Sequence, residues 1–252
     1  MVKVMAGQDE IRDIELMVFD KDGTLIDLYT YWSNMIALRA ERLCEYYGLS
    51  KDEHKYNLMN EMGVDIKKKR LKPEGPVGLL PRNIVQKAAE DYLDVINCSD
   101  VSTAAFDVFK EVDKLSLDLL DTFIKPIKGA TELLQGLKEK KCRIAIATTD
   151  KTERARLAVE FLNMADFIDI IVGADKVKNS KPSPDMLEVI TEELKIAPVN
   201  SVMIGDAETD VRTGINAGFK ASIGVCSGLT DKKTLMGLTQ YVVSDVSEIK
   251  VK

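Results

Sequence analysis

The sequence lacks the residues and segments on which several classes of protein depend. It has four widely separated cysteines, no Cys-x-x-Cys pair and a single histidine, which argues against a zinc site of thiolate and imidazole ligands. Scattered thiols of this kind are typical of a reducing, cytoplasmic compartment. The apolar runs have the length of strands, far short of the roughly 20 residues of a membrane-spanning helix, and no apolar signal region follows Lys3. We expect a cytoplasmic protein without a membrane partner.

Positive charge is also in short supply. The chain of 252 residues has 35 lysines and arginines against 41 aspartates and glutamates, which gives a net charge of −6. A nucleic-acid-binding protein needs a basic face that displaces counterions from phosphates, so we expect no nucleic-acid partner. Hydrophobic residues make up 45% of the chain and charged residues 30%, which is ordinary for a globular protein of one large domain or two modest ones. A monomer and a homodimer both remain open.

Three short apolar runs, at residues 16–19, 143–147 and 201–204, have the character of strands that are covered on both faces. Each is followed at once by small polar or acidic residues. Weaker strand patterns occur at residues 168–172, 221–225 and 241–243. Amphipathic helical stripes alternate with the strands from residue 127 onward. This alternation predicts an α/β fold with a doubly wound parallel sheet.

Residues 28–126 have a different pattern, without strand-like alternation. An apolar helical stripe that includes Tyr46 ends at Gly48, and two further amphipathic stripes follow. We therefore predict an all-helical insertion, placed within a core domain that consists of residues 1–27 and 127–252.

Four features of the insertion bear on its role. Residues 72–78 have the composition of a loop. We interpret the basic run at residues 67–70 as a solvated helix end, and His54 as a surface residue with no obvious partner. Arg82, which follows the loop, is a candidate to reach a substrate from the insertion.

The first group with chemical potential is a pair of carboxylates directly after the first apolar run. Asp20 and Asp22 are one residue apart, and Gly23 allows a sharp turn that brings backbone N–H groups toward the same point. The carboxyl end of a parallel strand opens onto the usual ligand crevice. Two carboxylates at this spacing repel each other unless a cation lies between them or one is protonated. A solvated turn is the alternative for this motif on its own.

A second acidic pair follows the run at residues 201–204. Asp206 falls at the end of that strand, and Asp210 lies about one helical turn further on. Alone, the two could simply favour a helix N-terminus. Together with Asp20 and Asp22 they would place several carboxylates at one sheet edge, which is strongly repulsive without a cation. Oxygen-rich clusters of this type hold Mg²⁺ in proteins, with a substrate phosphate completing the coordination.

Two further residues offer what an anion needs. Thr148 ends the run at residues 143–147 with a hydroxyl and a backbone N–H, and Lys181 stands directly before a proline, which restricts it to an extended backbone. Each is commonplace on its own. Thr149 is a rival to Thr148, and the role of Asp150, next to a phosphate pocket, stays open between an active-site function and a helix cap.

The order of these pieces resembles the four-motif signature of the haloacid dehalogenase (HAD) superfamily. Strand–DxDGT, strand–Thr, Lys-Pro and strand–GDxxxD follow one another as in that superfamily, and the resemblance covers about residues 14–27 and 127–225. A helical insertion directly after the first motif resembles the subgroup with a helical cap domain, which includes phosphoglycolate phosphatase-like enzymes and β-phosphoglucomutase. The resemblance does not extend to the details of the cap, at residues 28–126.

The resemblance implies roles for the acidic residues. Asp20 would be the nucleophile that forms an aspartyl-phosphate, and Asp22 would act as general acid and then as general base. Mg²⁺ would be held by a side-chain oxygen of Asp20, the backbone carbonyl of Asp22, and Asp206. Asp210 would orient Asp206 or a metal-bound water from behind.

The resemblance also implies a phosphate-binding set. Thr148, with Thr149 as its rival, and Lys181 would hold the transferring phosphoryl oxygens, and the turn at Gly23 would contribute to the same pocket. Lys181 would in addition offset the negative charge around Asp20 and is counted among the catalytic residues.

The sequence thus predicts a Mg²⁺-dependent phosphatase that acts on a small phosphorylated metabolite, such as phosphoglycolate or a sugar phosphate. The cap would close over the core through hinges near residues 26–30 and 124–130 and select the leaving group. A phosphomutase shares every core motif and is the nearest alternative. A dehalogenase needs neither Asp22 nor a metal and is less favoured, and a non-catalytic phosphate-sensing or partner-binding module is the alternative from another class.

Overall fold

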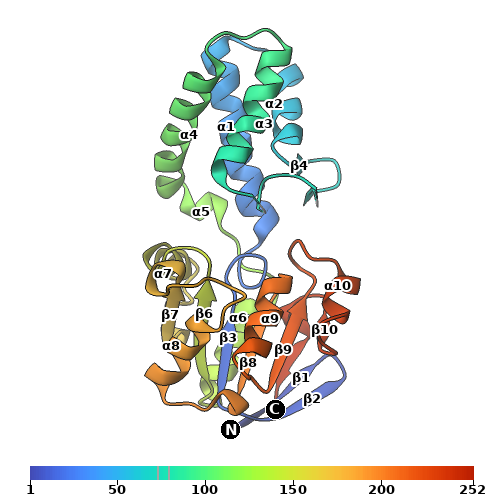
Figure 1. Cartoon of the computed structure of the whole chain (residues 1–252), viewed down its shortest axis with the longest axis vertical. Helices are drawn as coiled ribbons and strands as arrows, with labels where there is room; N and C mark the ends of the chain where they lie inside the picture. Colours follow the sequence, from blue (N-terminus) through green and yellow to red (C-terminus); the bar gives the residue numbers. More distant parts are fainter. Residues whose placement is uncertain (73, 79) are drawn as a thin grey trace. The chain divides into compact units, whose positions relative to one another are not determined.

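Six parallel strands form the central sheet (Figure 1). The structure, a computed structural model, describes residues 1–72, 74–78 and 80–252, with the side chains of 117, 120 and 121 left out. In spatial order the strands are β10 (Val242–Val243), β9 (Ala221–Val225), β8 (Ser201–Gly205), β3 (Leu16–Phe19), β6 (Arg143–Thr148) and β7 (Ile170–Gly173). The chain runs outward from β3 through β6 and β7 and then crosses to β8. The prediction of a doubly wound parallel sheet is confirmed.

The central strand β3 ends at the same edge of the sheet as its two neighbours, so the polar residues that follow these strands emerge close together. All four residues of β3 are buried, as its unbroken apolar run predicts. Phe19 lies opposite Ile146 of β6 and Ile204 of β8. Since all three strands are parallel, their carboxyl ends meet at the same edge, on either side of the point where the strand order reverses. This is the usual ligand position in such sheets.

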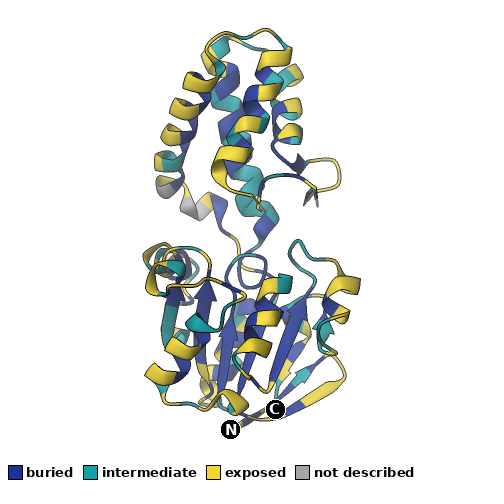
Figure 2. Cartoon of the chain, in the orientation of Figure 1, coloured by how far each residue is buried: buried dark blue, intermediate teal, exposed yellow. Residues whose placement is uncertain are grey.

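Helices cover both faces of the sheet, and Figure 2 shows its central strands, β3 and β8, as buried. These helices are α6 (Ala130–Glu139), α7 (Thr152–Phe161), α8 (Asp185–Leu194), α9 (Glu208–Asn216) and α10 (Lys232–Met236), with 3₁₀ turns at Ala165–Phe167, Ala174–Lys176, Pro198–Asn200 and Val246–Glu248. Met186, Leu187 and Ile190 of α8 pack against Leu16 and Val18 of β3. Alternate residues of a strand point to opposite faces, so Met17 and Phe19, equally buried, fill the other layer.

A second, antiparallel sheet joins the two ends of the chain and was not predicted. It consists of β2 (Asp9–Ile14), β1 (Val2–Ala6) and β11 (Ile249–Val251), with β1 in the middle. In β2 only Ile11 and Ile14 are buried, so its pattern is weak. Strand β1 pairs with β2 on one side and, on the other, with β11 from the far end of the chain. Pairing with so distant a segment produces no pattern in the local sequence.

The chain divides into two compact units, Met1–Asp27 with Pro126–Lys252, and Leu28–Lys125. The second unit, hereafter the helical unit, contains α1 (Leu28–Tyr47), α2 (Lys51–Glu61), α3 (Arg82–Val95), α4 (Val101–Asp118) and α5 (Leu120–Phe123). It also contains one two-stranded hairpin, β4 (Val64–Asp65) with β5 (Arg70–Leu71), which is an addition to the expected helices. Across the described residues, no helix combines the length and the apolar character needed to cross a membrane.

Several local interpretations of the helical unit need correction. The basic run at residues 67–70 lies in the turn of the β4–β5 hairpin and at the start of β5, not at a helix end, although it is solvent-exposed as expected. Helix α2 escaped detection because it has no continuous apolar stripe, and it buries only Leu58 and Met59. Tyr46, assigned to the apolar face of α1, is 61% exposed.

His54, for which no partner was expected, and Arg82, the candidate substrate contact, both have partners inside the helical unit. The His54 Nδ1 lies 2.9 Å from the Tyr92 hydroxyl. The Arg82 Nε lies 3.0 Å from a carboxylate oxygen of Asp113, which also accepts a 2.8 Å hydrogen bond from the buried Arg39. Asp113 therefore ties α1, α3 and α4 together, and Arg82 has a structural contact within its own unit.

Candidate active site

Three carboxylates from two distant parts of the chain meet at the carboxyl edge of the central sheet. Oxygens of Asp20, Asp206 and Asp210 lie within 4.8 Å of one another. The Asp20 N–H donates a 2.8 Å hydrogen bond to the Ile204 carbonyl, so the end of β3 is fixed beside the end of β8. Asp206 leaves β8, and Asp210 stands in the first turn of α9. The structure thus brings together three of the four carboxylates expected to meet, and these three are buried.

Lys181 is the cation of this cluster. Its ammonium nitrogen lies 2.7 Å from Asp20 Oδ1 and 2.7 Å from Asp210 Oδ1, and its side chain is 1% exposed. The second oxygen of Asp210 accepts the Ala207 N–H at 3.0 Å. Asp210 is therefore occupied on both oxygens and holds Lys181 in place beside Asp20.

Asp206 is enclosed by a wall of residues, Thr24 with Gly228 and Leu229, that the sequence analysis did not identify. Thr24 donates a 3.3 Å hydrogen bond to Oδ1, and the Leu229 N–H donates a 3.4 Å hydrogen bond to Oδ2. A Cβ at Gly228 would overlap the Asp206 carboxylate. Next to it, the Ser227 hydroxyl donates a 2.6 Å hydrogen bond to the Gly23 carbonyl. The absence of a side chain at Gly228 is the one signal in the sequence, and it has meaning only once the fold is known.

Gly23 serves the site in a different way from the one expected. Its φ is +87°, a conformation that glycine adopts without strain. Its N–H donates a 2.8 Å hydrogen bond to the Ile26 carbonyl, so that group closes the turn and is not directed at an anion. A Cβ at this position would lie 2.6 Å from the carboxyl carbon of Asp206. The close approach of Asp206 therefore requires a glycine here.

The charge balance of the cluster calls for a further cation. With all three carboxylates ionised beside one ammonium, the formal charge would be −3 + 1 = −2 in a buried space. Burial raises the pKa of Asp20 to about 7, against the opposing effect of Lys181. Burial, with Asp20 and Asp210 nearby, also raises the pKa of Asp206 well above its usual range. Burial alone would lower the pKa of Lys181, but the two carboxylates outweigh it and raise it.

This donor set fits a hard divalent ion. Carboxylate oxygens in a group with a net charge of −2 are what Mg²⁺ prefers. The raised pKa values of Asp20 and Asp206 show that these carboxylates lack enough nearby positive charge to offset their burial. A bound divalent ion would supply that charge and favour the deprotonated form of both ligands.

Asp22 lies outside this cluster. Both of its carboxylate oxygens contact the Lys21 ammonium, at 2.7 and 2.6 Å, and its side chain is 33% exposed. Lys21 was not singled out in the sequence, yet its side chain is only 7% exposed. Asp22 is thus held toward Lys21 and is not among the three carboxylates that approach one another.

The residues after β6 separate into distinct roles. Thr148 is buried and its hydroxyl oxygen accepts the Asp150 N–H at 3.1 Å, whereas Thr149 is exposed. Asp150 does not cap α7, because the first N–H of that helix, from Thr152, donates to Asp175 at 2.6 Å. The Asp150 carboxylate lies instead 3.5 Å from the Lys21 ammonium.

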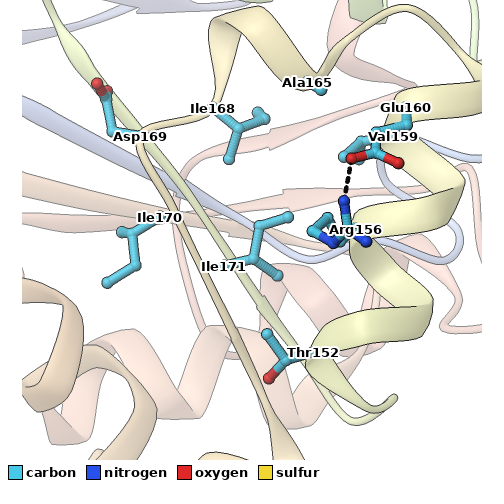
Figure 3. A pocket seen from close by; sticks show the side chains of 9 residues that line it. All are labelled: Thr152, Arg156, Val159, Glu160, Ala165, Ile168, Asp169, Ile170 and Ile171. Carbon is cyan, nitrogen blue, oxygen red and sulfur yellow. Dashed lines mark hydrogen bonds and ion pairs between the residues drawn. The ribbon is translucent and has the colours of Figure 1, made fainter.

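A separate cavity of about 360 Å³ lies between α7 and β7 (Figure 3). Figure 3 shows Ile171 of β7 facing Arg156 and Glu160 of α7, which form an ion pair. The other charged group of the lining, Asp169, contacts Arg143 at 3.4 Å. None of the residues proposed for the reaction lines this cavity, so it is not the catalytic site.

The sequence matches a known family over both units of the chain. Residues 14–218, more than half of the chain, match haloacid dehalogenase-like hydrolases. The chain belongs to this family. The predictions of the HAD superfamily and of a hydrolytic enzyme are confirmed.

Individual relatives are similar over most of their length. A phosphorylated carbohydrates phosphatase of Thermotoga maritima is 25% identical across 88% of this chain and 90% of its own, and a phosphoglycolate phosphatase of Aquifex aeolicus is 25% identical across 84% and 85%. A crystal structure from Thermotoga maritima, described provisionally as a β-phosphoglucomutase, covers 93% of this chain and 96% of that one, with 23% identity and a TM-score of 0.66. The predicted class, a phosphoric monoester hydrolase, agrees with the two phosphatases.

Proposed function

We propose that this HAD hydrolase is a Mg²⁺-dependent phosphatase that releases phosphate from a small phosphorylated metabolite through an aspartyl-phosphate on Asp20. The observation that carries the proposal is the buried group of Asp20, Asp206, Asp210 and Lys181. The two phosphatases that the chain resembles act on phosphorylated carbohydrates and on phosphoglycolate, and a metabolite of this kind is the substrate class we propose. Four free thiols suit a reducing, cytoplasmic location.

The first half-reaction transfers the phosphoryl group to the protein. An oxygen of Asp20 attacks phosphorus, the bond to the substrate oxygen breaks, and the Asp22 carboxyl gives its proton to the leaving alcohol. Lys181, 2.7 Å from Asp20, attracts the phosphoryl oxygens and offsets their charge. Thr148, at the end of β6, contributes its backbone N–H and hydroxyl to the phosphate site.

The second half-reaction returns the enzyme to its starting state. Water attacks phosphorus, the bond to Asp20 breaks, and Asp22 accepts the proton of the water. Asp20 and Asp206, with the backbone carbonyl of Asp22, would hold Mg²⁺, and Asp210 supports them through Lys181 and the Ala207 N–H. When bound, Mg²⁺ supplies the positive charge that this group of carboxylates lacks and that phosphoryl transfer requires.

The helical unit is proposed to act as the cap of this enzyme. In the sequence, it is inserted between the two segments of the core unit, Met1–Asp27 and Pro126–Lys252. Ile26 and Pro126, next to its two connections, pair in an antiparallel β-bridge. A cap that closes over the nucleophile can exclude water and select the leaving group.

A phosphomutase remains the second candidate, since the fold resembles a structure described as a β-phosphoglucomutase. A mutase returns the phosphoryl group to the sugar, whereas a phosphatase transfers it to water. Incubation with a hexose phosphate and analysis of the products decides: we expect free phosphate, and an isomeric sugar phosphate would assign a mutase.

A screen of phosphorylated metabolites, with and without Mg²⁺, tests the proposed function. We expect Mg²⁺-dependent release of phosphate from at least one small monoester and from p-nitrophenyl phosphate. Binding of phosphorylated ligands without any release, under the same conditions, would contradict the proposal and favour a phosphate-sensing module.

Gly228→Ala is expected to weaken Mg²⁺ binding and catalysis through Asp206. A methyl group at this position would overlap the Asp206 carboxylate, which must then move. Displacement of this kind typically costs about 10- to 100-fold in metal affinity and up to about 100-fold in rate. The measurement is phosphatase activity as a function of Mg²⁺ concentration.

Gly136→Ala provides the matched control for this variant. Gly136 lies within α6, and a Cβ there meets nothing within 4 Å. Because alanine favours a helix over glycine, we expect unchanged kinetics and equal or higher stability. An unchanged Mg²⁺ dependence in Gly228→Ala would remove the role assigned to the wall around Asp206.

A further inference from the structure

Lys21 is a buried cation that the proposed reaction does not employ. It stands between the proposed nucleophile Asp20 and the proposed acid–base residue Asp22, and its side chain is only 7% exposed. Its ammonium contacts both oxygens of the Asp22 carboxylate, at 2.7 and 2.6 Å. A buried lysine stripped of water is unfavourable unless its charge is matched. The Asp22 carboxylate supplies this match, so the buried Lys21 ammonium and Asp22 are held together.

The ammonium of Lys21 has a second carboxylate partner that is itself fixed. Asp150 lies 3.5 Å away. The Asp150 N–H donates to the Thr148 hydroxyl at 3.1 Å, and the Asp150 carbonyl accepts the Ala174 N–H at 3.0 Å. Arg154 approaches the same carboxylate at 3.6 Å. Asp150 is thus anchored through its backbone at the end of β6, and its carboxylate contacts the Lys21 ammonium.

The backbone of Lys21 is equally constrained. Its carbonyl accepts the N–H groups of both Leu25 and Ile26, each at 3.0 Å, so the turn after Asp20 closes around it. A lysine fixed at its backbone and paired at its ammonium offers a defined contact. Of the two carboxylates that pair with Lys21, that of Asp22 is the more exposed, at 33% against 24% for Asp150.

We propose that Lys21, anchored by Asp150, is a positioning residue for the Asp22 carboxylate. The inference rests on the proposed function and concerns its second half-reaction. There a water oxygen bonds to phosphorus, the phosphorus–oxygen bond to Asp20 breaks with its electron pair returning to Asp20, and the water proton passes to Asp22. Lys21 contacts both oxygens of the Asp22 carboxylate, so its ammonium sets where the group that accepts this proton lies.

The Lys21→Met variant tests this role, because methionine keeps the length of the side chain and removes its charge. With p-nitrophenyl phosphate in a rapid-mixing experiment, we expect a burst of about one equivalent of p-nitrophenol. The following steady-state rate should be roughly 10- to 100-fold lower than that of the unmodified enzyme, the scale of a displaced proton-transfer group. Protein-bound phosphate should accumulate. Lys21→Arg should restore much of the rate, and Asp150→Asn should give a smaller slowing of the same step.

Lys138→Met is the matched control, because Lys138 also pairs with an aspartate of the core unit, Asp169, at 3.6 Å. We expect this variant to leave both half-reactions unchanged. Dephosphorylation at the wild-type rate in Lys21→Met, or equal slowing of both half-reactions, would overturn the inference. If Lys21→Met does not fold, the same two outcomes in Asp150→Asn decide. Failure of the proposed function looks different, because the unmodified enzyme would then show no phosphate release and no phosphate bound to Asp20.

Discussion

Replacing Asp20 with asparagine is expected to lower the rate of phosphate release by about 10⁴-fold or more, the scale on which removal of a catalytic nucleophile acts. The amide has no carboxylate oxygen that can bond to phosphorus. Measurement requires a phosphatase assay sensitive enough for the residual rate, and mass analysis that excludes deamidation to aspartate. Appreciable activity in verified asparagine protein would contradict the assignment of the nucleophile.

The same variant should fold at least as well as the unmodified chain without Mg²⁺. Asp20 is buried beside Asp206 and Asp210, and replacing one carboxylate of three reduces their repulsion. Lys181 retains its 2.7 Å contact with Asp210. We expect an equal or higher Tm by circular dichroism. Asp166→Asn, at an exposed aspartate of the same unit, is the control and should leave both activity and Tm unchanged.

The sequence predicts the central part of this site because the geometry of a parallel sheet makes it local. Asp20 and Thr148 follow an apolar run directly, Asp206 follows one after a single glycine, and parallel strands end at one edge. Once the runs are recognised as neighbouring strands, the residues after them must be close. The structure agrees at Asp20 and Asp206, whose oxygens meet.

Contacts that depend on the path of a loop were beyond this reasoning. Ser227, Gly228 and Leu229 follow β9 with no chemical signature, and their contacts with Gly23 and Asp206 depend on how the chain turns after the strand. Similarly, the ion pairs of Lys21 arise from the turn after Asp20. A lysine or glycine in a loop has many possible environments, and its neighbours in sequence do not select among them.

The peripheral elements show the same limit. β1 and β11 pair across nearly the whole chain, and α2 buries two residues without a periodic stripe. The basic run at residues 67–70 lies in a hairpin and not at a helix end, because charged residues suit either exposed position. Composition gives the exposure of such residues, while the element that carries them depends on packing elsewhere.

Asp206→Asn is expected to abolish the response of the protein to Mg²⁺. One carboxylate oxygen is lost from a group whose net charge is −2, so affinity for a divalent ion falls steeply and activity with it, by about 100-fold or more at Mg²⁺ concentrations that saturate the unmodified enzyme. Chelation by EDTA should abolish activity in the unmodified enzyme, and added Mg²⁺ should restore it.

Thermal unfolding separates metal binding from catalysis. At a Mg²⁺ concentration of about 100 times its Kd, a bound ion stabilises the folded state by about 2.7 kcal/mol, so the Tm of the unmodified protein should rise. Asp206→Asn should show little or no rise, and without Mg²⁺ its Tm should equal or exceed that of the unmodified protein. A full Mg²⁺ response in Asp206→Asn would place the metal elsewhere.

The stabilisation by Mg²⁺ should also depend on pH. Without metal, Asp20 has a pKa of about 7 in the folded state, above the ordinary value of about 4 in the unfolded chain. The folded state therefore binds the extra proton, and stability contributed in this way is present below pH 4 and lost as the pH rises to 7. Mg²⁺ replaces that proton, so the rise in Tm should be larger at pH 8 than at pH 5. An equal rise at both values would show that the ion does not bind at Asp20.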